Sequence, residues 1–311
     1  MDAITIKTGS LQAQNIGDLY NNWLQFIEGT EATSNTYTKA VRIFIKYLQE
    51  RQITQPTRED VKAYREELKA EGKKPTTVQL YLMAVKQLFK WTDEEGLYPN
   101  IAKNVKTGVK LDTEHKKDYL TTKQVKTLLG SIDQDTAQGR RDIAIISLML
   151  TTGLRTIEVV RANVGDLKPV GDYTALFVQG KGHTEKSQYV KIPAQVEKAI
   201  RDHLADRDNI DSQQPLFCSL AHRNKGERLT TKSISRLVKD HLIAVGLESE
   251  RLTAHSLRHT TATLNLLNGG TVEETQQLLR HTNINTTLIY SHALERANNN
   301  SEMRVAGAIF S

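Results

Sequence analysis

The 311-residue sequence contains one cysteine, Cys218, so the chain has no internal disulfide and fits a reducing compartment. No stretch approaches the roughly 20 apolar residues that a membrane-spanning helix requires. The first ten residues, MDAITIKTGS, lack the apolar segment of a secretory signal. These absences argue against a secreted or membrane protein, and we expect the chain in the cytoplasm.

Several common catalytic motifs are also missing. No glycine-rich loop that could cradle nucleotide phosphates occurs, so ATP use is not expected. His255 and His259 are spaced i, i+4 as in a zinc helix, but Ser256 stands where the metalloprotease pattern requires Glu. No nucleophile-elbow pattern marks a serine hydrolase, and Cys218 has no context typical of a cysteine nucleophile. We therefore expect no metal site and no cofactor.

The basic residues are unevenly distributed. The formal net charge is +6, yet residues 1–100 hold 13 Lys and Arg against 13 Asp and Glu. The excess begins in 101–117, where five lysines face Asp112 and Glu114. Such a segment can lie along a phosphate backbone or serve only as a solvated linker. The sequence thus predicts a domain over 1–100, a basic linker over 101–117, and a second domain over 118–311 with a C-terminal tail, 295–311.

Apolar spacing predicts a helical bundle in the first domain. One helix is expected from a Ser34 cap to about residue 50, another from Pro75 to about residue 91, and Thr57 with Asp60 resembles a capping box. Both helices carry a basic stripe away from the apolar face. Such a stripe is either the solvated side of an amphipathic helix or a surface that binds DNA. The candidate DNA-binding residues are Lys39, Arg42, Lys46, Lys86 and Lys90.

The second domain combines helices with two short strands. The strands are predicted from Tyr173 to Gln179 and from Gln188 to Ile192, joined by the turn Gly180–His183. One helix is expected to start at Thr121–Gln124, and further helices are expected near 141–150, 194–205, 231–244, 256–268, 272–280 and 286–294. The predicted fold class is mainly α with a small antiparallel β-sheet (α+β).

Two arginines that are distant in the sequence, Arg155 and Arg258, indicate an anion, because a guanidinium group matches two phosphate oxygens at once. A tyrosine such as Tyr290 is a poor nucleophile, since a pKa of ~10 makes ionisation at pH 7 cost roughly 4 kcal/mol. A cluster of cations and imidazoles could stabilise much of that charge. A tyrosine phosphodiester would keep the energy of the broken bond, so no ATP would be needed for resealing.

Four stretches carry a family resemblance: TTGLRTIEVVRANVGDL, GKGHTEKSQYVKIP, TAHSLRHTTATLNLLNGG and QQLLRHTNINTTLIYSHA. In order, spacing and flanks they resemble the tyrosine recombinases, or phage-integrase family. The N-terminal half resembles the helical core-binding domain of that family more loosely, through SNTYTKAVRIFIKYL and KKPTTVQLYLMAVKQLFKW.

The resemblance implies one role for each matching residue. Tyr290 would attack the scissile phosphate and form a 3′-phosphotyrosine, while His255 would assist removal of its proton. Arg155 and Arg258 would bind the non-bridging oxygens. Lys181 would protonate the departing 5′ oxygen, and His281 would donate to the phosphate.

Three further positions complete the resemblance. Glu158 matches an acidic position that supports the site structurally, and His259 matches no catalytic role, so helix-face packing or a hydrogen bond is expected for it. Arg280 stands where the family usually has Gly before the His of the third motif. We expect small consequences if Gly only eases a turn there, and Arg280 could also touch DNA.

The resemblance further implies a site-specific recombinase that acts on double-stranded DNA by sequential strand exchange through a Holliday junction. Four protomers would assemble on DNA, with a monomer when free, and the C-terminal tail would dock on a neighbouring protomer. Because only about 13 residues precede the first domain, we expect a simple chromosome-resolution or transposon-like type, associated with the nucleoid. The alternatives are a non-catalytic DNA-binding protein that retains the fold, and an integrase that depends on accessory factors.

Overall fold

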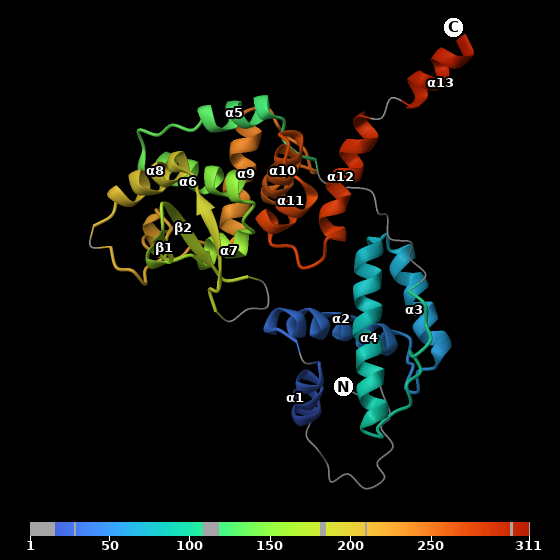
Figure 1. Ribbon diagram of the computed structural model, residues 1–311. Coiled ribbons are helices and arrows are strands. Elements are labelled where there is room, and N and C mark those ends of the chain that lie inside the picture. Colours follow the sequence, from blue (N-terminus) through green and yellow to red (C-terminus); the bar gives the residue numbers. More distant parts are fainter. Residues whose placement is uncertain are drawn as a thin grey trace. The chain divides into compact units, whose positions relative to one another are not determined.

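The structure is a computed structural model that describes residues 16–27, 29–107, 118–180, 185–208, 210–298 and 301–310 (Figure 1). The chain divides into two compact units, Met1–Thr113 and Glu114–Ser311. Each unit has its own hydrophobic core. Within the described ranges, no helix has the length and apolarity needed to cross a membrane.

The described residues of the first unit form four helices, which are α1 (Ile16–Phe26), α2 (Glu31–Glu50), α3 (Arg58–Ala70) and α4 (Pro75–Glu94). Helix α2 begins before the expected Ser34 cap, because the side chain of Thr30 accepts a hydrogen bond from the backbone N–H of Thr33. The predicted capping box is present at α3, where the Thr57 N–H donates to Asp60 over 2.7 Å. Pro75 opens α4 at a position whose N–H is not needed.

Aromatic side chains form much of the core of the first unit. The rings of Phe44 and Tyr64 lie 5.0 Å apart between centroids, and Phe89 meets Phe44 edge-on. Ala102 and Val105 are buried in the same core, so the beginning of the expected linker packs as part of this unit. The reason is that two apolar side chains three residues apart face inward while Lys103 stays exposed. The rest of the expected linker, residues 108–117, lies outside the described residues.

The second unit is mainly helical with a small antiparallel sheet, so the predicted fold class is confirmed. The sheet order is β1–β2–β3, from β1 (Leu167–Val170), β2 (Tyr173–Val178) and β3 (Gln188–Ile192). Strand β1 was not predicted from the sequence; it is a four-residue edge strand in which Leu167 pairs with Leu176. The helices are α5 (Thr122–Gly130), α6 (Ala137–Thr152), α7 (Thr156–Arg161), α8 (Ala194–Ala205), α9 (Thr231–Ala244), α10 (Ala254–Leu267), α11 (Val272–Leu279), α12 (Asn285–Asn298) and α13 (Ser301–Phe310), with single 3-10 turns at Val164–Asp166 and His222–Asn224.

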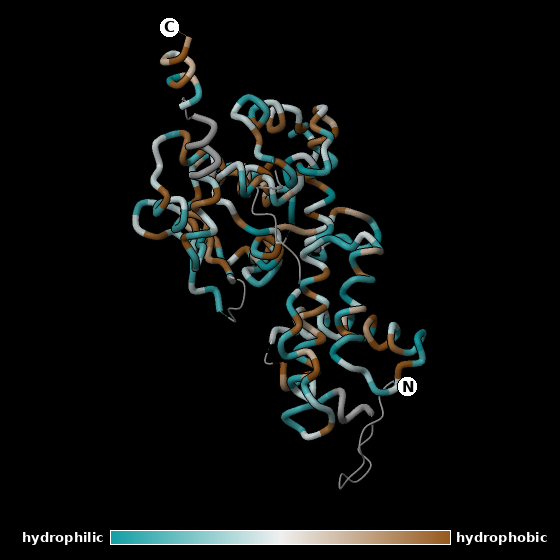
Figure 2. The backbone as a smooth tube through the Cα atoms, turned by 90° about the vertical axis from the view of Figure 1, so that its right-hand side faces the viewer, coloured by the Kyte–Doolittle hydropathy of each residue, from teal (hydrophilic) through white to brown (hydrophobic). Residues whose placement is uncertain are grey.

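Helix α6 is the centre of the second unit, and it contacts α5, α8, α10 and β3. Most of its residues from Arg141 onward are buried. Hydrophobic and hydrophilic residues alternate along the helices, as expected for amphipathic helices packed on a core (Figure 2). The helix ends at Gly153, whose φ of 61° is a left-handed conformation that glycine adopts without strain. This turn places Arg155 at the start of the next helix.

Candidate active site

Arg155 is oriented by a single carboxylate, that of Glu158. Arg155 is the N-cap residue of α7, which begins at the next residue. Its backbone N–H donates to Glu158 Oε2 over 2.7 Å, and its Nη1 donates to Glu158 Oε1 over 3.0 Å. The Glu158 side chain is fully buried, whereas that of Arg155 remains 30% exposed. The guanidinium is thus held from within the protein while part of it stays open to solvent.

Arg258, on the second turn of α10, is almost fully buried. It donates to the backbone carbonyl oxygens of Gly153 and Leu279, which end α6 and α11. Burial, followed by the nearby Arg155, lowers its pKa to about 9. A buried cation beside other cations favours an anion as its partner. The burial of Arg258 therefore fits a phosphate site.

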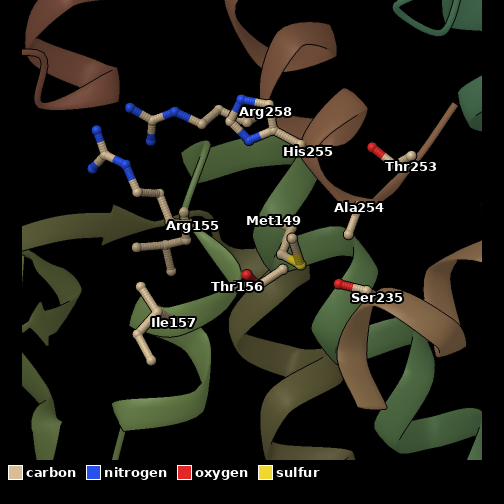
Figure 3. A pocket seen from close by; sticks show the side chains of 10 residues that line it. Met149, Arg155, Thr156, Ile157, Ser235, Thr253, Ala254, His255 and Arg258 are labelled. Carbon is tan, nitrogen blue, oxygen red and sulfur yellow. The ribbon is translucent and has the colours of Figure 1, made fainter. Parts of the chain in front are cut away.

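Arg155, Arg258 and His255 line one cavity of about 300 Å³. Figure 3 shows the two guanidinium groups extending toward the same side of this cavity, with the imidazole of His255 beside Arg258. The three residues come from α10 and from the junction of α6 and α7. The structure therefore brings Arg155 together with His255 and Arg258, which lie about a hundred residues further along the sequence.

Tyr290, on α12, is 5% exposed, and its hydroxyl oxygen lies 2.5 Å from Nδ1 of His259. The rings of His255 and His259 meet edge-on, with centroids 4.6 Å apart. Burial raises the pKa of Tyr290 to about 12, although Arg258 and Arg155 act in the opposite direction. The phenol is therefore neutral at pH 7. For His259 the sequence predicted either helix-face packing or a hydrogen bond. The structure shows a hydrogen bond, and its partner is Tyr290, the candidate nucleophile.

Arg280 ends α11 with φ 54° and ψ 47°, a left-handed conformation. This explains why glycine suits the position, because that conformation costs a residue with a Cβ about 1 kcal/mol or more. The side chain is only 7% exposed, and its Nη2 donates to Glu158 Oε2 over 2.9 Å. This ion pair was not predicted from the sequence, where the one available signal was the departure from the usual glycine.

His281 follows directly and is half-buried. Its Nδ1 lies 2.9 Å from the hydroxyl oxygen of Thr287. Burial, followed by the nearby Arg258, Arg155 and Arg280, lowers the pKa of His281 to about 4. The imidazole is therefore neutral at pH 7. Lys181, the remaining candidate of the site, lies outside the described residues.

The candidate DNA-binding residues lie on the surfaces of α2 and α4. Lys39, Arg42, Lys46 and Lys90 are exposed and Lys86 is partly buried. Two of them form exposed ion pairs within their own helix, Lys46 with Glu50 at 3.5 Å and Lys90 with Glu94 at 3.6 Å. Such pairs contribute little, so the lysines can exchange their partners for phosphate at small cost. Lys86 and Lys90 also line a hollow of about 510 Å³, which Asp93 and Glu94 share.

Two family models match the chain. That of the phage integrase family matches residues 118–296, and that of the phage integrase N-terminal SAM-like domain matches residues 19–96. Tyrosine recombinase slr0733 of Synechocystis sp. is 32% identical over 229 residues, which is 73% of this chain and 71% of the relative. Tyrosine recombinase XerD of Listeria innocua is 27% identical over 289 residues, 89% of this chain and 94% of that protein.

Solved structures show the same fold. The XerH site-specific recombinase, in a post-cleavage complex with a palindromic difH substrate, superposes with a TM-score of 0.69 at 24% identity, covering 85% of this chain and 78% of that one. A Tn1549 transposon integrase in complex with a circular intermediate DNA gives a TM-score of 0.67 at 21% identity, covering 89% of this chain and 95% of the other. At these identities the likeness establishes the fold.

Proposed function

The chain belongs to the phage integrase family, and from that membership and the geometry of the site we propose that it recombines DNA at specific sites through Tyr290. The observation that carries the proposal is the assembly of Arg155, His255 and Arg258 around one cavity, with Tyr290 held by the neighbouring imidazole of His259. No further component is needed in principle, because a phosphotyrosine conserves the bond energy that resealing uses.

In the proposed cleavage step, the Tyr290 oxygen bonds to the scissile phosphorus and the bond to the 5′ oxygen breaks, which leaves a 3′-phosphotyrosine. The phenolic proton passes to the pair of imidazoles, His255 and His259, and Lys181 supplies the proton that the departing 5′ oxygen needs. The two arginines bind the non-bridging oxygens, whose negative charge grows in the transition state. Reversal with a different 5′ hydroxyl rejoins the strand.

His281 would donate to the same phosphate as a neutral imidazole. If the Thr287 hydroxyl donates to Nδ1, the ring proton resides on Nε2, the nitrogen left to face the substrate. The lowered pKa of His281 supports this assignment, because a neutral imidazole carries its proton on one nitrogen only. His281 thus contributes a directed hydrogen bond rather than a full charge.

We expect the functional assembly to be four protomers on a double-stranded recombination site in nucleoid DNA, in the cytoplasm, with strands exchanged in sequence through a Holliday junction. The apolar side chains Met303, Val305, Ile309 and Phe310 of α13 are exposed, which supports docking of this helix on a neighbouring protomer. Deleting residues 302–311 should leave monomer melting and single-site binding intact while abolishing synapsis. A truncated protein that recombines at the wild-type rate would contradict the docking.

The function is tested by covalent capture. Wild-type protein is incubated with random-sequence duplexes that carry 5′-bridging phosphorothiolates, whose leaving group needs no proton, and adducts that survive SDS are sequenced. Tyr290→Phe should form no adduct, yet shift the enriched duplex in a gel as the wild type does. The matched control is Tyr189→Phe, the same change at an exposed strand residue. DNA binding without adducts by the wild type would favour the non-catalytic alternative.

A further inference from the structure

Arg280 is an arginine in a place that suits glycine. Its backbone is left-handed at the last turn of α11, and its guanidinium is almost fully buried. Both features make arginine unfavourable here, because a Cβ strains a left-handed backbone and burial removes the hydration of the charged guanidinium. Of its nitrogens, Nη2 donates to Glu158 and Nη1 to the carbonyl of Leu278, while Nε has no acceptor among the described residues. The carboxylate of Glu158 is therefore the partner that orients the side chain.

Glu158 has two guanidinium partners, Arg155 and Arg280. Its Oε1 accepts from Nη1 of Arg155, and its Oε2 accepts from Nη2 of Arg280 and from the backbone N–H of Arg155. With glycine at 280, Oε2 would keep only the backbone hydrogen bond, and the buried carboxylate could turn about its last bond. Because Arg155 is held through Oε1, any such turn would move its guanidinium.

We propose that Arg280 is a positioning residue, which acts through Glu158 to hold the Arg155 guanidinium in line with the scissile phosphate. The Arg280–Glu158 pair joins the turn before α12, the helix that carries Tyr290, to the start of α7, where Arg155 lies. It thereby links the placement of the nucleophile to that of one phosphate ligand. The proposal rests on the proposed recombinase function of the site.

The distribution of charge around the site also supports a role for Arg280. Arg280 adds a third cation next to Arg155 and Arg258, and it is among the groups that lower the pKa values of Arg258 and His281. Glu158 offsets part of this excess, so the cluster keeps a net positive charge that a phosphate can neutralise. Removing Arg280 would therefore both loosen Arg155 and weaken the field at the phosphate.

The test compares single-turnover cleavage, at saturating concentrations of the captured duplex, in Arg280→Gly, Arg280→Lys and wild type. We expect Arg280→Gly to slow cleavage about tenfold with no more than a twofold change in DNA affinity, the pattern expected when an interaction made only in the transition state is removed. The Lys ammonium can reach the Glu158 carboxylate and keeps the positive charge, so Arg280→Lys should recover part of the rate. If Arg280→Gly cleaves at the wild-type rate, the proposal is wrong.

A double-mutant cycle with Glu158→Gln separates positioning from general electrostatics. The effect of Arg280→Gly should shrink to under threefold in the Glu158→Gln background, because the shared partner is gone. An equal effect in both backgrounds would overturn the proposed route through Glu158. Should Arg280→Gly fail to fold, Arg280→Asn serves in its place, since Asn also tolerates the left-handed conformation.

The matched control is Gln52→Gly. Gln52 is exposed, has the same φ of 54° and lies in the other unit, so its replacement relieves the same backbone strain without touching the site. It should melt slightly higher and cleave at the wild-type rate. If instead it slows cleavage as Arg280→Gly does, the slower rate would belong to the backbone change and the proposal would fail.

A second readout needs no DNA and separates this inference from the recombinase function itself. The readout is the exchange with solvent of the guanidinium N–H protons of Arg155 in the free protein, followed through their ¹⁵N resonance. That resonance is identified by its disappearance in Arg155→Lys. Exchange should be slow in wild type and at least tenfold faster in Arg280→Gly. A wild type that never cleaves DNA, together with this change in exchange, would defeat the function but retain the ion-pair positioning. Unchanged exchange would defeat the positioning alone.

Discussion

The two units bury different kinds of side chain. The first unit packs Phe44, Tyr64 and Phe89 in its core and keeps ion pairs such as Lys46–Glu50 at the surface. The second unit has a larger aliphatic core, but it also buries Glu158 and Arg258, with Arg280 nearly so. Burying charges lowers stability unless each is paired. Three of the buried ions lie together at the candidate active site, where the chain gives up stability for function, while a further buried pair, Arg141 with Asp142, lies in α6 beside His241.

Replacing Arg258 and Arg42 in turn gives the largest expected difference between the two units. Arg258→Ala removes a buried guanidinium that donates to two carbonyl oxygens and should lower the free energy of unfolding by about 2–3 kcal/mol, as well as abolish cleavage. Arg42→Ala, on the surface of α2, should change it by less than about 0.5 kcal/mol. Urea unfolding at pH 7 measures both. Equal changes in the free energy of unfolding would show that the buried Arg258 contributes no more to stability than the exposed Arg42.

The basic stripes of the first unit should act on DNA affinity and not on stability. Replacing Arg42, Lys46, Lys86 and Lys90 with Ala should flatten the plot of log K against log salt, by roughly 0.9 for each phosphate that is no longer neutralised by a side chain. The control replaces Lys198 and Arg201 of α8, which form comparable exposed pairs with Asp202 and Glu197. If the slope stays unchanged in the first variant, the stripes are only the solvated faces of their helices.

A smaller effect is expected from acid, and it should come from the second unit. His203 of α8 is 1% exposed and stacks on Phe217; burial, followed by the nearby Arg207, lowers its pKa to about 4. The fold therefore favours neutral His203. Its contribution is complete above the unfolded pKa of about 6.5 and is lost as pH falls toward 4, by about 1 kcal/mol at pH 5.5.

His203→Phe should make stability depend less on pH between 6.5 and 4, as followed by urea unfolding at several pH values. His281, whose pKa is lowered to about the same value, should account for part of the remaining decrease. The matched control is His222→Phe at an exposed position, which should keep the wild-type dependence. A variant at 203 that loses stability with acid as steeply as the wild type would contradict the buried, neutral histidine.

Most of the helices and two of the strands could be predicted from the sequence, and the family resemblance proposed the residues of the site. Helix ends follow from contacts within one turn, such as the Thr57–Asp60 box, and such local signals can be found in a single sequence. The cap at Thr30 and the four-residue strand β1 were not predicted, because Ser34 offered an equally good cap and a strand that short has little periodicity. Ala102 and Val105 were assigned to the linker, because lysines surround them in the sequence.

How the site residues pair became visible only in the folded chain. The hydrogen bonds of Tyr290 with His259, of Arg258 with Gly153 and of Arg280 with Glu158 join residues that are 31, 105 and 122 positions apart. No periodicity or cap spans such distances, since these pairings depend on where whole helices pack against one another. The resemblance could therefore predict that a tyrosine, two arginines and their imidazoles form one site. It could not say that His259 would hold the tyrosine, or that Arg280 would share a carboxylate with Arg155.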